Sequence, residues 1–389
     1  MTAPLLWQTA PHAGYFINSV GTSNDGRTVV AGTFFHSYSG ERRAGANSNN
    51  GTFGIYSLDP DTGTTLWSNT FTGFEGVYWA TVSNDASHAA SCGWYSSTPT
   101  YSGFIAAFDA ATGASALDYY KTPSRVNQVA LNADGSVLAA GGDQLYLFFR
   151  SGTQFTTTPS TLGVASGDSV ISIGISADGQ WVAAGTYEGV VLLAKTVDGV
   201  PVSSNKWTPT NASTVHSVAM AANGQGFAVG MTNGEFVYFD CASFIAAGAS
   251  AAPAWTQLLA GASSVYGVAI ASDASFVSAV GNIGSTGGTV AVFDNSGSAA
   301  TLRWQQSLTA NPNSTSIDSE GLFVAVADGH PDGTPGHFTL FNAASSAQIW
   351  SCTTGNMSWP IQLAGNAMAC VAGSDDGNVY YFSPLRVLA

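Results

Sequence analysis

The chain has 389 residues, 45 of them glycine, and only 9% are Asp, Glu, Lys or Arg. Its formal net charge of −14 would repel a phosphate backbone or an anionic lipid surface, so we expect neither nucleic acid nor a membrane as a partner. No apolar run approaches the roughly 18 residues that cross a bilayer. Ten Trp among many Gly favour short strands joined by tight turns.

The N-terminus and the cysteines bear on the compartment. Residues Met1 to Trp7 carry no basic stretch and no long apolar core, so they do not form a signal peptide. Because a Lys-poor surface rich in Ser, Thr, Asn and Gly is common in exported proteins, a periplasmic or secreted location is slightly favoured if Met1 replaces a removed leader. Otherwise we expect a cytoplasmic one. The cysteines are scattered, which predicts reduced thiols and no structural zinc: Cys92, Cys241, Cys352 and Cys370.

One pattern recurs eight times along the chain. Each copy has an apolar alternation, a turn with an acidic residue or Asn often followed by Gly, a second apolar run that ends near Gly, and a third apolar run. Successive turns are 44 to 60 residues apart, about the length of a four-stranded propeller blade. The turn residues are Asp25, Asp85, Asp134, Asp178, Asn223, Asp273, Glu320 and Asn366.

The repeats predict an all-β fold, a single eight-bladed β-propeller domain over residues 1–389. Most residues four positions before the turns are small, as innermost strands crowded around an axis require. The third runs are continuously apolar, which is typical of strands buried on both faces. The expected blades span residues 15–71, 76–121, 125–160, 168–209, 213–259, 263–309, 312–354 and 357–388.

The last repeat is incomplete and the chain start supplies what it lacks. The eighth copy stops after its third strand, near Leu385, whereas a strand-like segment around Trp7 precedes the first copy. We expect residues 4–9 to form the outer strand beside Val379–Ser383, closing the ring and removing exposed sheet edges. Most other outer strands also carry a tryptophan: Trp67, Trp207, Trp255, Trp304 and Trp350.

Two propeller families are similar to parts of the chain. The segment from Leu58 to Trp67, LDPDTGTTLW, resembles the tryptophan-docking repeat of quinoprotein-like (PQQ-like) propellers, in which a D…TG turn precedes an outer-strand Trp. The inner hairpins, such as Val126 to Gly141, resemble those of WD repeats instead. Quinoprotein enzymes have an adjacent Cys pair beside PQQ and a calcium site with a catalytic Asp. No two cysteines here are adjacent, so PQQ is not expected and no other cofactor is indicated.

The two faces of the expected ring differ in their loops. Turns between first and second strands are short, whereas loops between second and third strands are long in blades one, two, six and seven. Examples are Phe34–Thr52, Trp94–Ser102 and Asp328–His337. Long loops often carry binding groups, although tolerated insertions need no function. We therefore predict the functional face on the long-loop side.

A ring of side chains points to the same face. Seven residues before each turn, where the innermost strand begins, most residues can hydrogen-bond or stack: Asn18, Tyr78, Asn127, Ile171, His216, Tyr266, Asn313 and Trp359. Aromatic surfaces with a few polar groups suit a ligand. Together with Trp79 and Arg125 they predict a binding site at the channel mouth. The alternative, that these side chains only cap strand ends, stays open.

Histidines and carboxylates supply the candidates for chemistry. Most histidines fall in segments assigned to the long-loop face. Converging imidazoles bind transition metals or act as general bases. We expect that no metal binds; the weak candidate ligands, should one bind, are His12, His36, His330 and His337. The candidate catalytic residues are His36, His216, Glu75 and Asp168.

The leading hypothesis is a monomeric propeller that binds a small molecule, a glycan or a protein segment at the long-loop mouth. The alternative is an enzyme that uses the same mouth, with histidine and carboxylate side chains performing acid–base or metal-assisted chemistry on a small organic substrate. No nucleophile elbow, phosphate loop or HExxH motif occurs, so the sequence favours no reaction class. Whether the chain is an enzyme stays open at this point.

Overall fold

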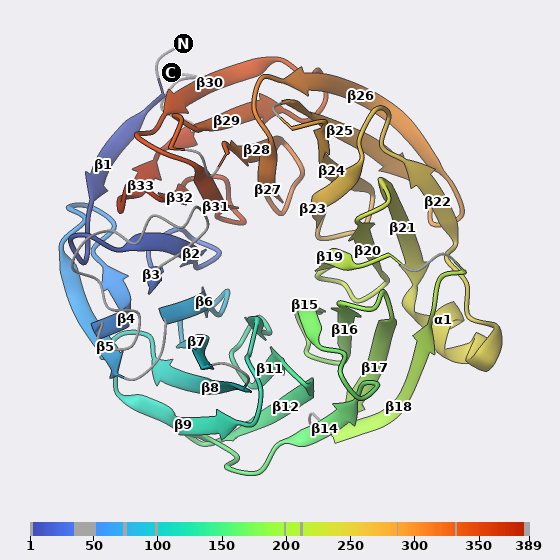
Figure 1. The fold of residues 1–389 in the computed structure, drawn as a ribbon, viewed down its shortest axis with the longest axis horizontal. Helices are drawn as coiled ribbons and strands as arrows, with labels where there is room; N and C mark the ends of the chain where they lie inside the picture. The colour runs from blue at the N-terminus through green and yellow to red at the C-terminus, as the bar shows by residue number, and fades with distance from the viewer. Residues whose placement is uncertain are drawn as a thin grey trace.

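The computed structural model describes residues 3–34, 52–72, 76–97, 100–197, 200–210, 213–285, 287–330 and 333–384. These residues form antiparallel sheets arranged in a ring around a central channel (Figure 1), which is the architecture of a β-propeller. Within them, one α-helix, α1 (Cys241–Ala247), lies at the periphery of the ring. None of the described helices is long and apolar enough to cross a membrane.

The strands follow one another as meanders that run from the channel outward. The first two meanders share one sheet through a single pair, Phe34 with Gly76. They are β2 (Phe16–Thr22), β3 (Val29–Phe34), β4 (Thr52–Leu58) and β5 (Thr65–Thr72), then β6 (Gly76–Val82), β7 (His88–Ser97), β8 (Thr100–Asp109) and β9 (Ser115–Thr122). Two separate sheets follow: β10 (Gln128–Leu131), β11 (Val137–Gly141), β12 (Gln144–Ser151), β13 (Gln154–Phe155) and β14 (Ser160–Gly163); then β15 (Val170–Ile175), β16 (Trp181–Thr186), β17 (Val191–Val197) and β18 (Val200–Trp207).

The second half of the chain repeats this arrangement in three four-stranded meanders and a closing sheet. The meanders are β19 (Val215–Met220), β20 (Gly226–Met231), β21 (Glu235–Asp240) and β22 (Trp255–Leu258); β23 (Ser264–Ile270), β24 (Phe276–Ile283), β25 (Gly287–Asn295) and β26 (Ala300–Leu308); β27 (Pro312–Ile317), β28 (Phe323–Asp328), β29 (His337–Asn342) and β30 (Gln348–Thr353). The closing sheet contains β31 (Ser358–Leu363), β32 (Cys370–Ser374), β33 (Val379–Phe382) and β1 (Leu5–Thr9). Apolar side chains fill the space between successive sheets, as in the cluster that joins Ala228 and Phe236 to Val268 and Val277.

Backbone hydrogen bonds connect the innermost turns around the channel. The N–H of Ala133 donates to the carbonyl of Ala177 (3.0 Å), and the N–H of Ala177 donates to that of Ala222 (2.9 Å). Near the chain ends, Asn366 donates to Asn24 (3.1 Å). Because these bonds join one sheet to the next, each turn fixes the position of its neighbour. The bond from Asn366 to Asn24 makes the same connection between the last sheet and the first.

The N-terminal strand closes the ring as the sequence predicts. In Figure 1, β1 (blue) lies beside β33 (red), and Trp7 pairs with Tyr381 while Thr9 pairs with Val379. The Trp7 and Tyr381 rings stack with their centroids 5.1 Å apart. The indole N–H of Trp7 also donates to the carbonyl of Pro60 (2.8 Å) in the next sheet. Trp7 therefore holds both the last sheet and the first.

The outer-strand tryptophans dock on the following sheet. Trp67 donates its indole N–H to the carbonyl of Ala110 (2.8 Å), and its ring lies against Gly113, where an added Cβ would be only 2.7 Å from the indole. Gly113 has a φ of 72°, a conformation that glycine adopts without strain. Trp7 has the same relation to Gly63. The D…TG turns thus serve as docking surfaces for Trp.

The prediction of reduced cysteines is confirmed, since all four cysteines are free thiols. Cys92, Cys241 and Cys370 are buried, and burial raises the pKa of each of these thiols. Cys352 is half-buried. Because the thiolate is the reactive form, the three buried side chains act as small apolar residues within the packing between sheets.

The closure can be tested at Trp7. Trp7→Ala removes the stack on Tyr381 and the hydrogen bond to Pro60, and should lower the free energy of unfolding by about 3 kcal/mol, as for other buried aromatic truncations. The neighbouring variant Leu6→Ala changes a side chain that is 39% exposed and should cost about 0.5 kcal/mol. Urea denaturation followed by circular dichroism measures both. Equal stability of the two variants would contradict a closing role for Trp7.

Candidate functional site

A β-bulge marks the predicted ring position in the innermost strands. In β6 the pairs Val77–Gly93 and Trp79–Cys92 leave Tyr78 as an extra residue. A bulge of this kind re-aims a side chain out of the strand's alternation. The ring residues that occupy the same extra position in other innermost strands are Asn18, Ile171, His216, Tyr266 and Asn313, and in β31 the interruption contains Trp359.

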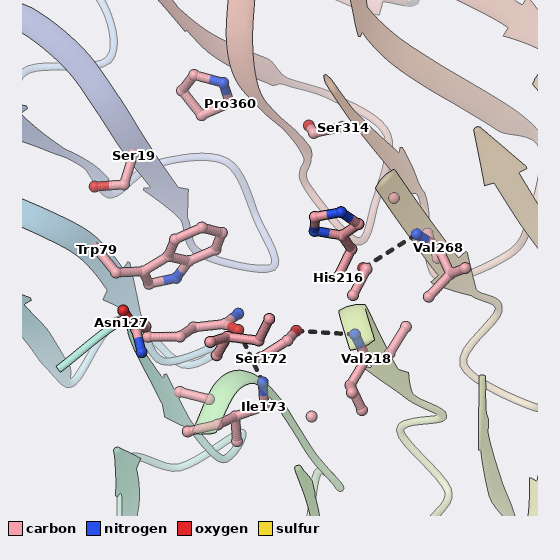
Figure 2. Close-up of a pocket in the computed structure, with 18 of the residues that line it drawn as sticks. Ser19, Trp79, Asn127, Ser172, Ile173, His216, Val218, Val268, Ser314 and Pro360 are labelled. Atoms are coloured by element: carbon pink, nitrogen blue, oxygen red, sulfur yellow. Dashed lines mark hydrogen bonds between the residues drawn. The ribbon is translucent and has the colours of Figure 1, made fainter. Parts of the chain in front are cut away.

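The innermost strands line a cavity of about 710 Å³ in the channel. Most of the predicted ligand-binding residues line it, namely Tyr78, Trp79, Arg125, Asn127, His216, Tyr266, Asn313 and Trp359. Figure 2 shows Trp79 and His216 projecting into the cavity from opposite walls. Among the described residues that line it, no side chain is a carboxylate. The structure thus assembles a largely uncharged mouth with aromatic side chains on several sides.

His216 and Tyr266 form a flat aromatic surface at this mouth. Their rings come from the adjacent strands β19 and β23 and stack at 4.4 Å between centroids, with 17° between the planes. Burial lowers the pKa of His216, so its imidazole is neutral at neutral pH. A neutral stacked pair suits contact with an apolar or aromatic group.

Tyr78 is held in an aromatic cluster beneath the opposite side of the mouth. Its ring centroid lies 5.5 Å from that of Phe34 and 5.8 Å from that of Trp94. Phe34 and Trp94 also contact each other edge to face. Tyr78 therefore both lines the cavity and packs the junction between the first two meanders, so replacing it would change stability as well as the mouth.

The ring asparagines join neighbouring innermost strands. Each side-chain amide donates to a backbone carbonyl of the next innermost strand: Asn18 to Tyr78 (2.7 Å), Asn127 to Val170 (2.8 Å) and Asn313 to Ser358 (2.8 Å). All three asparagines are buried. Their amides thus support the strand ends, while Asn127 and Asn313 also line the cavity and Asn18 is absent from its lining.

Of the candidates for acid–base catalysis, the described two, His216 and Asp168, do not share the cavity lining. Asp168 is buried outside the cavity lining and accepts hydrogen bonds from the backbone N–H groups of Ser169 (2.7 Å) and Glu188 (3.0 Å). Its Oδ1 therefore fixes the turn between β16 and β17, whereas its buried Oδ2 has no hydrogen-bond partner among the described residues. His216 is stacked on Tyr266 instead of being paired with a carboxylate. His36 and Glu75 lie outside the described residues.

The candidate metal ligands have other contacts. His12 Nδ1 is 3.0 Å from the Tyr56 hydroxyl, and His337 Nδ1 is 2.9 Å from Asp328 Oδ1. No group of three His, Cys, Asp or Glu side chains able to hold a metal occurs within the described ranges. The convergence that would make these histidines metal ligands is not observed there; His36 lies outside these ranges.

Parts of two predicted long loops are strands instead. In the segment Trp94–Ser102, β7 and β8 continue their pairing outward, with Tyr95 opposite Ser102 and Ser96 opposite Tyr101. Similarly, β24 and β25 pair out to Ile283 and Gly287. The extra residues lengthen the hairpins, and the continued strand pairing provides hydrogen bonds for backbone groups that in a loop would bond to water. The loop of residues 35–51 lies outside the described residues.

The sequence analysis missed serines inside the cavity. Ser172 Oγ accepts a hydrogen bond from Val218 N–H (2.8 Å), dashed in Figure 2, and Ser217 Oγ accepts one from Val268 N–H (3.1 Å). Each serine directly follows a ring residue in the sequence. A serine directly after four of the eight ring positions was the signal that could have identified them.

Comparisons with known proteins show the fold. No family model matches the chain, and no curated protein matches it. Among solved structures, Sqt1 of Chaetomium thermophilum, bound to the N-terminus of the ribosomal protein L10, is similar with a TM-score of 0.69 at 13% identity, covering 98% of this chain and 100% of that one. Sqt1 of Saccharomyces cerevisiae gives 0.69 at 12%, covering 98% and 99%. Both are WD40 propellers, and at these identities the likeness establishes the propeller fold alone.

The pKa values of two histidines should be shifted in opposite directions from 6.5. The hydrogen bond with Asp328 raises the pKa of His337 above 6.5, and burial lowers that of His216 below 6.5. The His337 pair therefore stabilises the fold below pH 6.5 and loses this contribution as the pH rises through the raised pKa. His216 destabilises it as the pH falls below 6.5. Imidazole proton shifts followed by NMR, assigned with His→Gln variants, measure both midpoints.

The control for this titration is Asp328→Asn. It should return the His337 midpoint toward 6.5 and leave that of His216 unchanged, because the two groups lie in different parts of the ring. Identical midpoints for both histidines in the wild-type chain would show that these environments are wrong.

Proposed function

We propose that the chain is an eight-bladed β-propeller that binds a protein segment at the channel mouth formed by its innermost-strand bulges. The observation that carries the proposal is the set of bulge-positioned aromatic side chains around one cavity. Support for eight blades comes from the meanders and the closing sheet, which agree with eight repeats of the turn pattern. We further propose one domain over residues 1–389, acting as a monomer.

The geometry of the mouth favours an extended chain as the ligand. Trp79 and the stack of His216 on Tyr266 project from different sheets, so a side chain placed between them would contact aromatic surface on two sides. Hydroxyl and amide groups of the innermost strands line the same cavity and can bind backbone groups of a segment. A similar propeller, Sqt1 of Chaetomium thermophilum, has been solved with the N-terminus of ribosomal protein L10, which supports this class of ligand.

The test is selection of binding peptides from a random display library with the full chain as bait. Trp79→Ala and His216→Ala should each weaken the selected peptides by about tenfold or more, because central aromatic anchors are commonly worth 2 kcal/mol or more at such sites. Binding is measured by isothermal titration calorimetry. Thermal melting of each variant checks the fold, since both side chains are half-buried.

The matched control is Glu320→Ala, which changes an exposed residue in a turn on the opposite face. Peptide affinity should stay within about twofold, as expected for a distant surface change. If this variant lost binding while the two mouth variants kept it, the functional face would be the other one. A library that yields no binding peptide would overturn the choice of a protein segment as the ligand.

A further inference from the structure

A second cavity lies away from the channel, in the groove between two neighbouring sheets. It has a volume of about 400 Å³, within the range of small-ligand sites. One wall belongs to β26 and includes Gln306 and Leu308, and the other belongs to the sheet of β28, β29 and β30. Gln306 Nε2 donates to Ser346 Oγ (3.2 Å) across the groove, so the two walls are in contact at one end.

The third strand of this sheet carries a threonine where the other third strands carry aliphatic or tyrosine side chains. His337, Thr339 and Phe341 alternate along β29 and line the cavity. At the register position of Thr339, four of the other third strands carry Ala106, Leu192, Val237 and Ala291, and three carry Tyr56, Tyr146 and Tyr380. Leu192 packs against the preceding sheet there. Replacing such a residue by threonine forgoes apolar burial, roughly 25 cal/mol per Å², and leaves room in the groove.

The polar groups of the cavity are organised before any ligand arrives. Asp328 is only 4% exposed, and its Oδ1 accepts hydrogen bonds from the backbone N–H and the Nδ1 of His337, both at 2.9 Å. This contact fixes the imidazole in place. Beside it, the hydroxyls of Thr339 and Ser351 lie 3.1 Å apart, and each can form further hydrogen bonds.

These groups define the kind of ligand that fits. Asp328 and His337 form a hydrogen-bonded pair that carries no net charge when the imidazole is protonated, and the remaining polar lining residues are amides and hydroxyls, such as Gln306, Gln348 and Ser351. The Asp328 carboxylate is already engaged by His337, and no Lys or Arg among the described residues lines the cavity to bind a phosphate group. The cavity offers many donors and acceptors at short spacing, and Phe341 supplies an apolar contact.

We propose that this groove is a second binding site, separate from the channel mouth, for a hydroxyl-rich ring: a sugar. Vicinal hydroxyls can each donate and accept, which matches paired amide and hydroxyl side chains. The apolar face of a sugar ring can contact Phe341. The same chemistry would recognise a free monosaccharide or the terminal residue of a glycan, and the experiment distinguishes these two sources.

The experiment is saturation-transfer-difference NMR on the full chain with glucose, galactose, mannose and N-acetylglucosamine, followed by oligosaccharides that end in each sugar. Saturation transfer to a free sugar supports a monosaccharide site. Transfer that requires the oligosaccharide supports a site for a glycan terminus. Absence of transfer to every sugar and oligosaccharide would overturn the proposal.

Three variants locate the binding. Thr339→Leu fills the groove as Leu192 does in its own sheet and should abolish the transfer while keeping the melting temperature. Gln348→Ala changes an exposed side chain and should weaken binding about tenfold. The matched control is Gln257→Ala, since Gln257 has the place in β22 that Gln306 has in β26, two residues after the outer-strand tryptophan, and lies outside the cavity. It should leave binding unchanged.

The channel mouth provides the last comparison. His216→Ala should leave sugar binding intact, so failure of the sugar site and failure of the peptide site are separate results. If Thr339→Leu bound sugar as the wild-type chain does, or if His216→Ala abolished it, the groove would not be the site.

Discussion

In the innermost hairpins, a bulge places two residues opposite one, and the geometry of the channel follows from this extra residue. The paired second-strand positions are small, such as Gly32, Gly185 and Gly230. At Gly185 an added Cβ would lie 2.1 Å from Val215 of the next sheet. Small residues let the sheets approach closely around the channel, and the bulge then moves one side chain per hairpin out of the crowded packing to the end of the strand.

The channel mouth is therefore formed by several sheets, each of which contributes only a few side chains. Trp79, His216 and Tyr266 come from three different meanders, so their mutual positions depend on the whole ring being closed. Closure in turn depends on Trp7, which stacks on Tyr381 and bonds to Pro60, and on the turn-to-turn bond from Asn366 to Asn24. Stability at the chain ends and the shape of the channel mouth are therefore physically linked.

The sequence predicts the fold well and the site only in part. Repeated turns, small inner residues and the strand at Trp7 are local patterns, so the propeller and its closure follow from them. The ring position is also local, because a bulge interrupts alternation. What these side chains contact is not local: the amides of Asn18 and Asn127 donate to carbonyls of the next innermost strand, and Asp168 Oδ1 accepts from the backbone N–H of Glu188. Such partners, distant in sequence, cannot be read from spacing.

The groove beside β29 is a second feature that depends on partners distant in sequence. Thr339 is an ordinary strand residue by composition, and only the strand register shows that it stands where Leu192 and Val237 stand in their sheets and Tyr146 and Tyr380 in theirs. His337 was noticed as a candidate metal ligand, whereas its partner Asp328 was not singled out. The pair forms because β28 and β29 place these two residues opposite each other, a fact of register that becomes visible once the strands are paired.

We propose the bulge-formed mouth as the binding face of the propeller. The most direct test is a crystal structure of the full chain with a selected peptide. We expect peptide density over the channel mouth, with a side chain between Trp79 and the His216–Tyr266 stack. Peptide density on the opposite face, where the turns between first and second strands lie, or along the outer strands, would contradict this proposal.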